Sequence, residues 1–385
     1  MEVRIIKEFA LPNVLEIFRS SSPVHLALYL CAGTIFLPFP ITAAVLLCVV
    51  IWAISQKEIR QAMFEQKGIP VLLSFFILLI VVPLCWGSEW GILAGIGAII
   101  VFLFMLYARA VITRESLLIS FNICCIASIV PFIYSIIEKL ILGFNFRSTA
   151  GCLNANYYGE MIEFVVLICV WNLIYNRRRY RLYLLILIMN AIGLLLCDSH
   201  SACAAIIISV ALMLFLSGHW KAGLIFSAVS AVFVTISVTV PGFLPRFDKM
   251  PDTFEKRVRI WESAWNGIKA HPILGQGILT YYFSCGQYEE IYTYHAHSIY
   301  LDPLLNYGIV GVSMLVYYFS TVFQKVFQFL HNLEMRRFSI LMICASAAIL
   351  VHGFTDVTIL WVQTGMLYFL ILSGAGLKAS ESGES

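Results

Sequence analysis

Charged residues are scarce in this chain, and their scarcity indicates its class. Asp, Glu, Lys and Arg make up 12% of the 385 residues, whereas 61% are hydrophobic. Soluble domains carry about 25% charged residues. The hydrophobic residues recur in runs of about 15 to 25, the length that a helix needs to cross a bilayer. The sequence therefore predicts an all-α, polytopic membrane protein.

Other signals are missing as well. The short alternating segments of a membrane β-barrel are absent, which excludes that class. The 11 cysteines show no C-x2-C spacing, and most fall inside apolar runs, as small buried side chains do. Cys152 and Cys285 lie in expected outward loops, and the sequence leaves their pairing open. There is no cleavable signal peptide, and residues 1–20 suggest a short cytoplasmic amphipathic segment.

The apolar runs predict about twelve transmembrane helices in one domain, residues 1–376, followed by a polar cytoplasmic tail, residues 377–385. The expected spans are 24–37, 41–55, 69–86, 91–108, 117–142, 160–176, 182–199, 202–217, 222–242, 299–323, 338–354 and 358–376. At Pro38 and Pro40 one kinked helix could replace two short ones, so the division there stays open.

Basic residues predict the orientation. Clusters of Lys and Arg fall in four loops, around Lys57–Lys67, Arg109–Arg114, Arg177–Arg181 and Lys325–Arg337. With twelve spans, all four loops lie on one side, which the positive-inside rule identifies as the cytoplasm. Both termini are then cytoplasmic. The long loop 243–298, between the ninth and tenth spans, faces outward.

This outward loop holds the residues best suited to chemistry on a charged substrate: Arg257, Arg259, His271, His295 and His297. Its first part predicts an amphipathic helix over 253–270, which starts at a capping-box-type Asp252 and Glu255 and ends at His271-Pro272. The apolar stripe of this helix recurs at spacings of three and four: Phe254, Val258, Trp261, Trp265 and Ile268.

Helical phase separates the two arginines of this segment. At about 100° per residue, Arg257 lies roughly 60° from the centre of the stripe and Arg259 roughly 140° away. If the stripe packs on the bundle, Arg257 can reach inward. It then either extends past Trp261 or binds an anion through its guanidinium group, and spacing alone does not choose between them.

Five tyrosines follow in the same loop, at positions 281, 282, 288, 292 and 294. They are typical either of an aromatic belt at the membrane interface or of a surface that stacks sugars. The belt is the safer interpretation.

Two histidines come just before the tenth span. His295 and His297 precede Ser298, which is a plausible N-cap, and a helix N-terminus attracts anions. A histidine there suits proton acceptance near a phosphate. The alternatives are a surface pair without a role or a weak metal site. Two histidines without a carboxylate or cysteine make a poor zinc site, so no metal is predicted.

Several motifs together resemble the superfamily of O-antigen ligases and polymerases. They are R-x3-W and H-P-I-L-G-x-G between Arg257 and Gly277, Y-H-A-H-S-I-Y-L from Tyr294, N-Y-G-I-V-G up to Gly311, an N-x-N segment at Asn154–Asn156, and H-G-F-T-D at His352–Asp356. The family has about twelve membrane helices with a large outward loop between the ninth and tenth, where the loop is also expected here.

The resemblance implies a membrane glycosyltransferase of cell-surface polysaccharide assembly in the bacterial cytoplasmic membrane. Its donor would be a glycan on undecaprenyl diphosphate, its acceptor a glycan or lipid, and transfer would invert the sugar without cofactor, metal or nucleic acid. His297 and Arg257 would be catalytic, accepting the acceptor proton and neutralising the leaving diphosphate. The implied substrate-binding residues are Arg259, His295, His200, Asp356, Asn156 and Trp261.

The chain departs from the family pattern at three places. His297 is followed by Ser298 rather than asparagine, Asn306 stands where the family often has glutamate, and His200 stands where it often has arginine. A polymerase is slightly favoured over a ligase. The alternative from another class is a polysaccharide or lipid-linked oligosaccharide transporter without catalytic activity, which would usually place ionisable groups within its spans.

Overall fold

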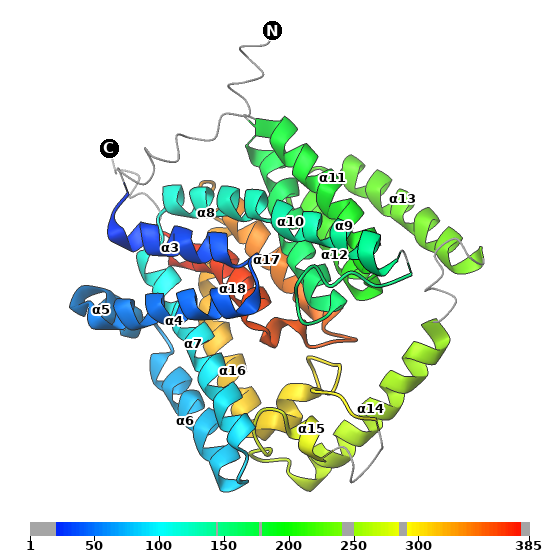
Figure 1. Ribbon diagram of the computed structural model, residues 1–385. Coiled ribbons are helices and arrows are strands. Elements are labelled where there is room, and N and C mark those ends of the chain that lie inside the picture. The colour runs from blue at the N-terminus through cyan, green and yellow to red at the C-terminus, as the bar shows by residue number, and fades with distance from the viewer. Residues whose placement is uncertain (1–20, 144, 177–178, 241–249, 285–290, 379–385) are drawn as a thin grey trace.

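The computed structural model describes residues 21–143, 145–176, 179–240, 250–284 and 291–378. Within these ranges the backbone forms helices and no strand (Figure 1). The predicted amphipathic segment at the N-terminus lies outside the described residues, as do Cys285, Tyr288 and most of the polar tail.

The apolar runs of the sequence form a series of packed helices. In chain order they are α3 (Pro23–Thr34), α4 (Phe39–Ser55), α5 (Lys57–Phe64), α6 (Ile69–Cys85), α7 (Glu89–Val111), α8 (Arg114–Ala127), α9 (Ile129–Leu142), α10 (Ala155–Tyr175), α11 (Tyr180–Cys197), α12 (His200–Leu216), α13 (Trp220–Thr239), α14 (Met250–Ala270), α15 (Thr280–Ser284), α16 (Asp302–Phe329), α17 (Arg336–His352), η4 (Thr358–Leu360), α18 (Val362–Leu372) and η5 (Ser373–Gly376). Each predicted span coincides with one helix or with consecutive helices of this series. At Pro38 the chain forms two helices, α3 and α4.

Length and hydropathy identify the helices that can cross a membrane. Among the described residues, six helical segments pass both tests, or seven if the bent pair α4 and α5 is one span. The six are α7, α8 with α9, α10, α11, α13 and α16. Others, such as α3, α6 and α12, are apolar but shorter. The molecule is therefore a helical membrane protein, while the count of twelve spans and the position of the loop between the ninth and tenth remain predictions.

Helix α10 is the centre of the bundle. It packs against α8, α11, α12, α17 and α18, and nearly all of its residues are buried (Figure 1). Gly159 permits close approach of α12, because a Cβ atom there would meet the side chains of Ser199 and Ala202. The Asn154 side chain caps the helix by accepting from the backbone N–H groups of Asn156 and Tyr157. The cap places Asn156 at one end of the buried helix.

Helix α14 is amphipathic, but its buried side differs from the predicted stripe. The buried residues are Ile260, Ser263, Ala264, Gly267 and Ile268, whereas Phe254 and Trp265 are 46% and 52% exposed. Helix α14 packs against α15 and α16, where Ile260, Ala264 and Ile268 form a buried cluster with Tyr281 and Leu305. The apolar residues of α14 cover more than one stripe, so their spacing alone does not tell which of them meet the neighbouring helices. The predicted stripe was therefore wrong in its phase.

Two glycine-containing motifs hold each other through their backbones. Helix α16 is broken at Gly308, where φ is 60° and ψ is −172°. At this break the N–H groups of Ile309 and Val310 donate to the carbonyl groups of Pro272 and Ile273, at 2.9 and 3.1 Å. The N–H of Gly277 donates to the carbonyl of Asn306 at 2.8 Å. The H-P-I-L-G-Q-G and N-Y-G-I-V-G motifs are therefore structural partners.

We predict that Gly308→Ala destabilises the protein by about 2 kcal/mol or more. An alanine Cβ would collide with the Ile273 backbone, and the positive φ is strained for any L side chain. Thermal unfolding of the purified protein in detergent measures the loss. The matched control is Gly97→Ala within α7, where no atom lies within 4 Å of the added Cβ. Equal midpoints for the two variants would contradict the role of the break.

Candidate functional site

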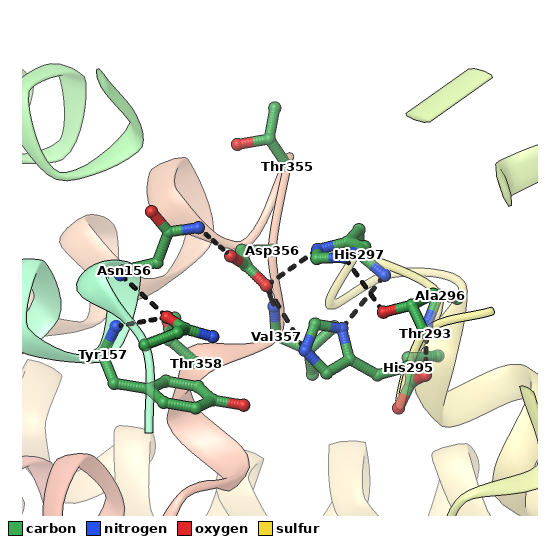
Figure 2. A network of polar contacts seen from close by, with 12 residues as sticks. Asn156, Tyr157, Thr293, His295, Ala296, His297, Thr355, Asp356, Val357 and Thr358 are labelled. Carbon is green, nitrogen blue, oxygen red and sulfur yellow. Dashed lines mark hydrogen bonds and ion pairs between the residues drawn. The ribbon is translucent and has the colours of Figure 1, made fainter. Parts of the chain in front are cut away.

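A buried carboxylate, Asp356, lies at the centre of a polar cluster (Figure 2). Nδ1 of His297 donates to its Oδ1 at 3.1 Å, and Nε2 of His295 lies 3.5 Å from the same oxygen. The amide of Asn156 donates to Oδ2, and the backbone N–H of Val357 donates to Oδ1 at 2.9 Å. Three predicted site segments, from α10, from the loop before α16 and from the turn after α17, therefore meet at one carboxylate.

The turn that carries Asp356 is held on two sides. The carbonyl of Gly353 accepts a hydrogen bond from the N–H of Ile299 at 2.8 Å, which ties the turn to the histidine loop. His352, the last residue of α17, forms a hydrogen bond through Nδ1 with Glu163 of α10. Both side chains of this pair are fully buried. The turn is thus fixed to the central helix before any substrate binds.

Local backbone geometry sets the direction of the two histidines. His297 has a left-handed φ of 47°, and its N–H donates to Nδ1 of His295 at 3.2 Å. The indole Nε1 of Trp261 donates to the His297 carbonyl at 3.2 Å. The N–H of Ala296 donates to the Asp302 carboxylate at 2.8 Å. Trp261 therefore positions His297 through the main chain.

Ser298 is not the N-cap of the following helix, so that interpretation was wrong. Helix α16 begins at Asp302 with Leu301 at its N-cap, and Ser298 Oγ instead accepts from the N–H of Tyr300 at 3.3 Å. The Asp302 carboxylate bridges back to the histidine loop and also accepts from the Asn306 amide at 2.7 Å. A short turn, residues 299–301, separates the histidines from the helix. The Asp302 carboxylate at the start of the helix holds the histidine loop through the N–H of Ala296.

The charges of the cluster follow from its burial. Burial lowers the pKa of His295 to about 4, although the Asp356 carboxylate opposes the shift. Burial alone would raise the pKa of Asp356, but the hydrogen bond from His297 and the nearby histidines hold it well below its ordinary value. At neutral pH Asp356 is therefore a carboxylate and His295 is neutral.

The hydrogen bonds also assign the His297 tautomer. A carboxylate only accepts hydrogen bonds, so Nδ1 of His297 carries a proton toward Asp356. Nε2 then accepts from the Thr293 hydroxyl at 3.2 Å. A histidine held in this way presents a lone pair to a hydroxyl group, which is the arrangement needed for proton acceptance.

A cleft of about 550 Å³ adjoins this cluster. Its lining includes Asn156, His200, Ser201, Arg257, Phe254 and Thr355. Arg257 is half-buried in the cleft wall, whereas Arg259, roughly 200° further around the helix, is exposed. His200 begins α12, with Nε2 3.6 Å from the Asp198 carboxylate. His271 lies elsewhere, with its ring 4.7 Å from that of Trp86.

Sequence reasoning missed Arg147 and Ser199, which both contact Asn156. Nη2 of Arg147 donates to the Asn156 side-chain oxygen at 2.9 Å, and Ser199 Oγ donates to the same oxygen at 3.1 Å. Arg147 also donates to the carbonyl groups of Cys197 and Asp198. The Arg147 guanidinium therefore lies beside the segment that leads to His200, the position at which the family often has arginine. The signal available in the sequence was its position nine residues before Asn156.

Glu160 and Glu163 were also overlooked as a group. Both carboxylates are fully buried on the face of α10 that carries Asn156, and His352 lies against Glu163. Ionisable residues inside a predicted span are costly and usually have a function, which was the available signal. Here the His352–Glu163 pair fastens the turn that holds Asp356.

The cluster includes a set of atoms that could hold a metal ion. One ligand atom each from His295, His297 and Asp356 lies within 4.8 Å of the others. The sequence argument against zinc assumed that no carboxylate was near, and Asp356, 59 residues from His297, supplies one. The same atoms already form the hydrogen bonds described above, so the set can serve as a hydrogen-bonded acid–base pair or as metal ligands.

Fold and site together define an integral membrane protein with a cleft of mixed polar and apolar lining beside a buried histidine–carboxylate pair. Residues 184–316 match the family model described as O-antigen ligase, which confirms the resemblance to the O-antigen ligase and polymerase superfamily. The match covers about a third of the chain, from α11 into α16. It contains His200, Arg257 and both loop histidines, while Asn156 and Asp356 come from outside it. No curated protein sequence matches the chain.

His295 predicts a pH dependence of stability. Its pKa is about 4 in the folded protein and 6.5 in its ordinary state. Between these values the unfolded chain binds a proton that the folded chain does not, so stability falls as the pH is lowered from 6.5 to 4. Thermal unfolding of His295→Gln, which keeps a donor toward Asp356, is expected to show a shallower fall than the wild type. His219→Gln, at an exposed histidine, is the control. Identical pH profiles for His295→Gln and the wild type would refute this assignment.

Proposed function

We propose that the protein is a membrane glycosyltransferase of cell-surface polysaccharide assembly. It transfers or polymerises a glycan carried on undecaprenyl diphosphate at the outer face of the bacterial cytoplasmic membrane. The observation that carries this proposal is the His297–Asp356 pair beside a cleft lined by Arg257. The family match supports this general activity in polysaccharide assembly. A polymerase is favoured over a ligase because Ser298 and Asn306 depart from the family motif.

His297 acts as the proton acceptor. Its Nε2 receives a hydrogen bond from Thr293 in the free protein, and an acceptor sugar hydroxyl takes that place in the complex. The hydroxyl oxygen attacks the anomeric carbon of the donor, the bond from that carbon to the diphosphate breaks, and the proton passes to Nε2. The Asp356 carboxylate stabilises the imidazolium that forms.

Arg257 neutralises the leaving diphosphate. Its half-buried position in the cleft wall places a fixed positive charge where negative charge develops, and such electrostatic stabilisation is usually the largest catalytic contribution. His200, which also lines the cleft, assists when protonated. Arg147 holds Asn156, and through it Asp356, in place.

An apolar groove supports a lipid-linked donor. His200, Ser201 and Ala204 line the polar cleft, and the same face of α12 continues into a second cleft of about 630 Å³ against α13. This second cleft is lined by Ile207, Ile208, Ala211, Leu212, Phe215, Ser227, Ser230, Ala231, Val234 and Thr235. A polar end and a long apolar extension on one helix face match a diphosphate group with an isoprenoid chain.

We predict that Arg257→Ala and His297→Ala each reduce glycan transfer by about 10²- to 10³-fold. Each removes one group that acts on the developing charge or on the proton. The variants are produced in the native host, and surface glycan is separated by size on a gel. Lys256→Ala, which removes an exposed cation from the same helix, serves as the control and retains wild-type glycan.

The same gel separates the two forms of the proposed reaction. Single unpolymerised units in the Arg257→Ala strain support a polymerase, and accumulated long lipid-linked chains support a ligase. Normal glycan in both variants, at wild-type protein levels, would overturn the proposed activity.

Chelation distinguishes the two uses of the histidine cluster. If His297 and Asp356 act as an acid–base pair, purified protein dialysed against EDTA keeps its transfer activity within about twofold. Added Mg²⁺ or Zn²⁺ then gives no stimulation. Loss of activity in EDTA that is restored by one of these ions would instead assign His295, His297 and Asp356 as metal ligands.

The transporter alternative has one observation in its favour. Glu160, Glu163 and His352 are buried inside the helical bundle, where ionisable groups often mark a translocation path. Transfer of labelled glycan by purified protein in detergent, without a sealed membrane, is possible only for an enzyme. If a Glu160→Gln variant keeps its transfer activity, the buried Glu160 carboxylate is not required for the transfer reaction.

A further inference from the structure

A third cleft, of about 410 Å³, lies between the α6–α7 turn and the segment that leads into α15. Its lining combines aromatic rings and polar groups: Trp86, Trp90, Phe283, Ser88, Glu89 and Gln276. In Figure 1 the α6–α7 turn and α15 lie at the same end of the bundle as α14. This cleft is therefore on the side of the molecule that carries the histidine loop, and nothing in the proposed transfer step uses it.

The walls of this cleft are held by close backbone contacts. Ser88 caps α7 by accepting from the N–H of Gly91, which places Glu89 and Trp90 in the first turn of the helix. A Cβ atom on Gly91 would meet the carbonyl of Ile278, and one on Gly277 would meet Pro83. The two walls can approach this closely only because both positions are glycine. The cleft is thus formed before a ligand binds.

The aromatic residues of this region present their rings to the surface. Trp90 is 64% exposed and Tyr294 60% exposed, and Trp86, Tyr282 and Phe283 are exposed as well. Such large exposed rings gathered at one end of the bundle are typical of a binding surface. Their packing contributes little to the hydrophobic core.

These rings form a continuous path from the cleft to the catalytic loop. Phe283 lines the cleft, and its ring centre lies 5.3 Å from that of Tyr282. Tyr282 stacks on Tyr294 with ring centres 5.3 Å apart and an angle of 16° between the planes. Tyr294 directly precedes His295, whose ring lies 4.5 Å from that of His297. An extended ligand that followed the rings would therefore end at Tyr294, three residues before the proposed proton acceptor His297.

We propose that this path and its cleft form a glycan-binding platform that holds sugar units away from the reacting end. Apolar faces of sugar rings stack on Trp90, Trp86, Phe283 and the two tyrosines, while sugar hydroxyls donate to Glu89 and Gln276. The platform rests on the proposed glycosyltransferase function and adds a second subsite to it. It holds the acceptor or growing chain, and so sets how long the product becomes.

The composition of the cleft favours this occupant over lipid. An aromatic belt at a membrane interface needs only rings, whereas this cleft also places a carboxylate, an amide and hydroxyl groups among them. Its described lining contains one carboxylate and no lysine or arginine. A glycan of neutral or amino sugars therefore fits better than one rich in uronic acids, which the Glu89 carboxylate would repel.

Binding of free oligosaccharide tests the platform without any chemistry. The probe is the surface polysaccharide of the native host, cleaved by mild acid and fractionated by length, and titrated calorimetrically into the full-length protein in detergent. Trp90→Ala is expected to bind the longer fragments about tenfold more weakly than the wild type. Trp90→Phe, which keeps a ring, is expected to retain most of the affinity.

A second exposed tryptophan provides the matched control. Trp220, 56% exposed, is the first residue of α13, at the helix end expected to face the cytoplasm. Trp220→Ala should bind oligosaccharide as the wild type does. In the native host, Trp90→Ala should shorten the surface glycan while single units are still joined, with an unchanged thermal midpoint of the protein.

The outcomes separate this proposal from the transfer reaction. Equal oligosaccharide affinities for the wild type and Trp90→Ala, or no measurable binding by the wild type, would overturn the platform. Oligosaccharide binding that is lost in Trp90→Ala, together with normal glycan in Arg257→Ala and His297→Ala strains, would leave the platform standing while the transfer function fails.

Discussion

A single buried negative charge organises this molecule. Burying a carboxylate costs several kcal/mol unless hydrogen-bond donors replace its water. Asp356 obtains them from His297, Asn156 and the N–H of Val357, which come from three segments of the chain. Because the Asp356 carboxylate needs these hydrogen-bond donors, it brings the segments together. It also fixes the tautomer of His297, so that the stability of the fold and the proposed chemistry depend on the same contacts.

The family motifs divide into two physical tasks. The glycine-containing motifs around residues 272–277 and 306–310 pair through their backbones at the break in α16, and they build the frame beneath the histidine loop. Arg257 and His297 stand on this frame and face the cleft and the carboxylate. The matched domain thus supplies Arg257 and His297, while the buried carboxylate comes from outside it. A site assembled in this way needs both parts of the chain to be folded.

Particular residues show where prediction from sequence stops. Helical spacing separates a half-buried Arg257 from an exposed Arg259, because rotation per residue is a property of any helix. The same spacing gave the wrong buried side of α14, because the apolar residues of this helix cover more than one stripe and the neighbouring helices determine which of them is buried. Ser298 looked like a cap from its neighbours alone, yet the helix begins only at Asp302, whose carboxylate accepts from the N–H of Ala296 in the histidine loop. Arg147 belongs to no motif, and its place nine residues before Asn156 could not show that the two side chains touch.

Composition and periodicity determined that this protein is a bundle of apolar helices, because hydrophobic runs of membrane-spanning length have few other stable forms. Motifs in the sequence also marked Arg257, His297 and Asp356 as candidates. Only the tertiary structure decided that His297 and Asp356 touch, since 59 residues separate them and no local pattern encodes such a contact. It likewise decided that exposed rings far apart in sequence form one path to the histidines, because the packing of α6, α7 and α15 brings them to one end of the bundle.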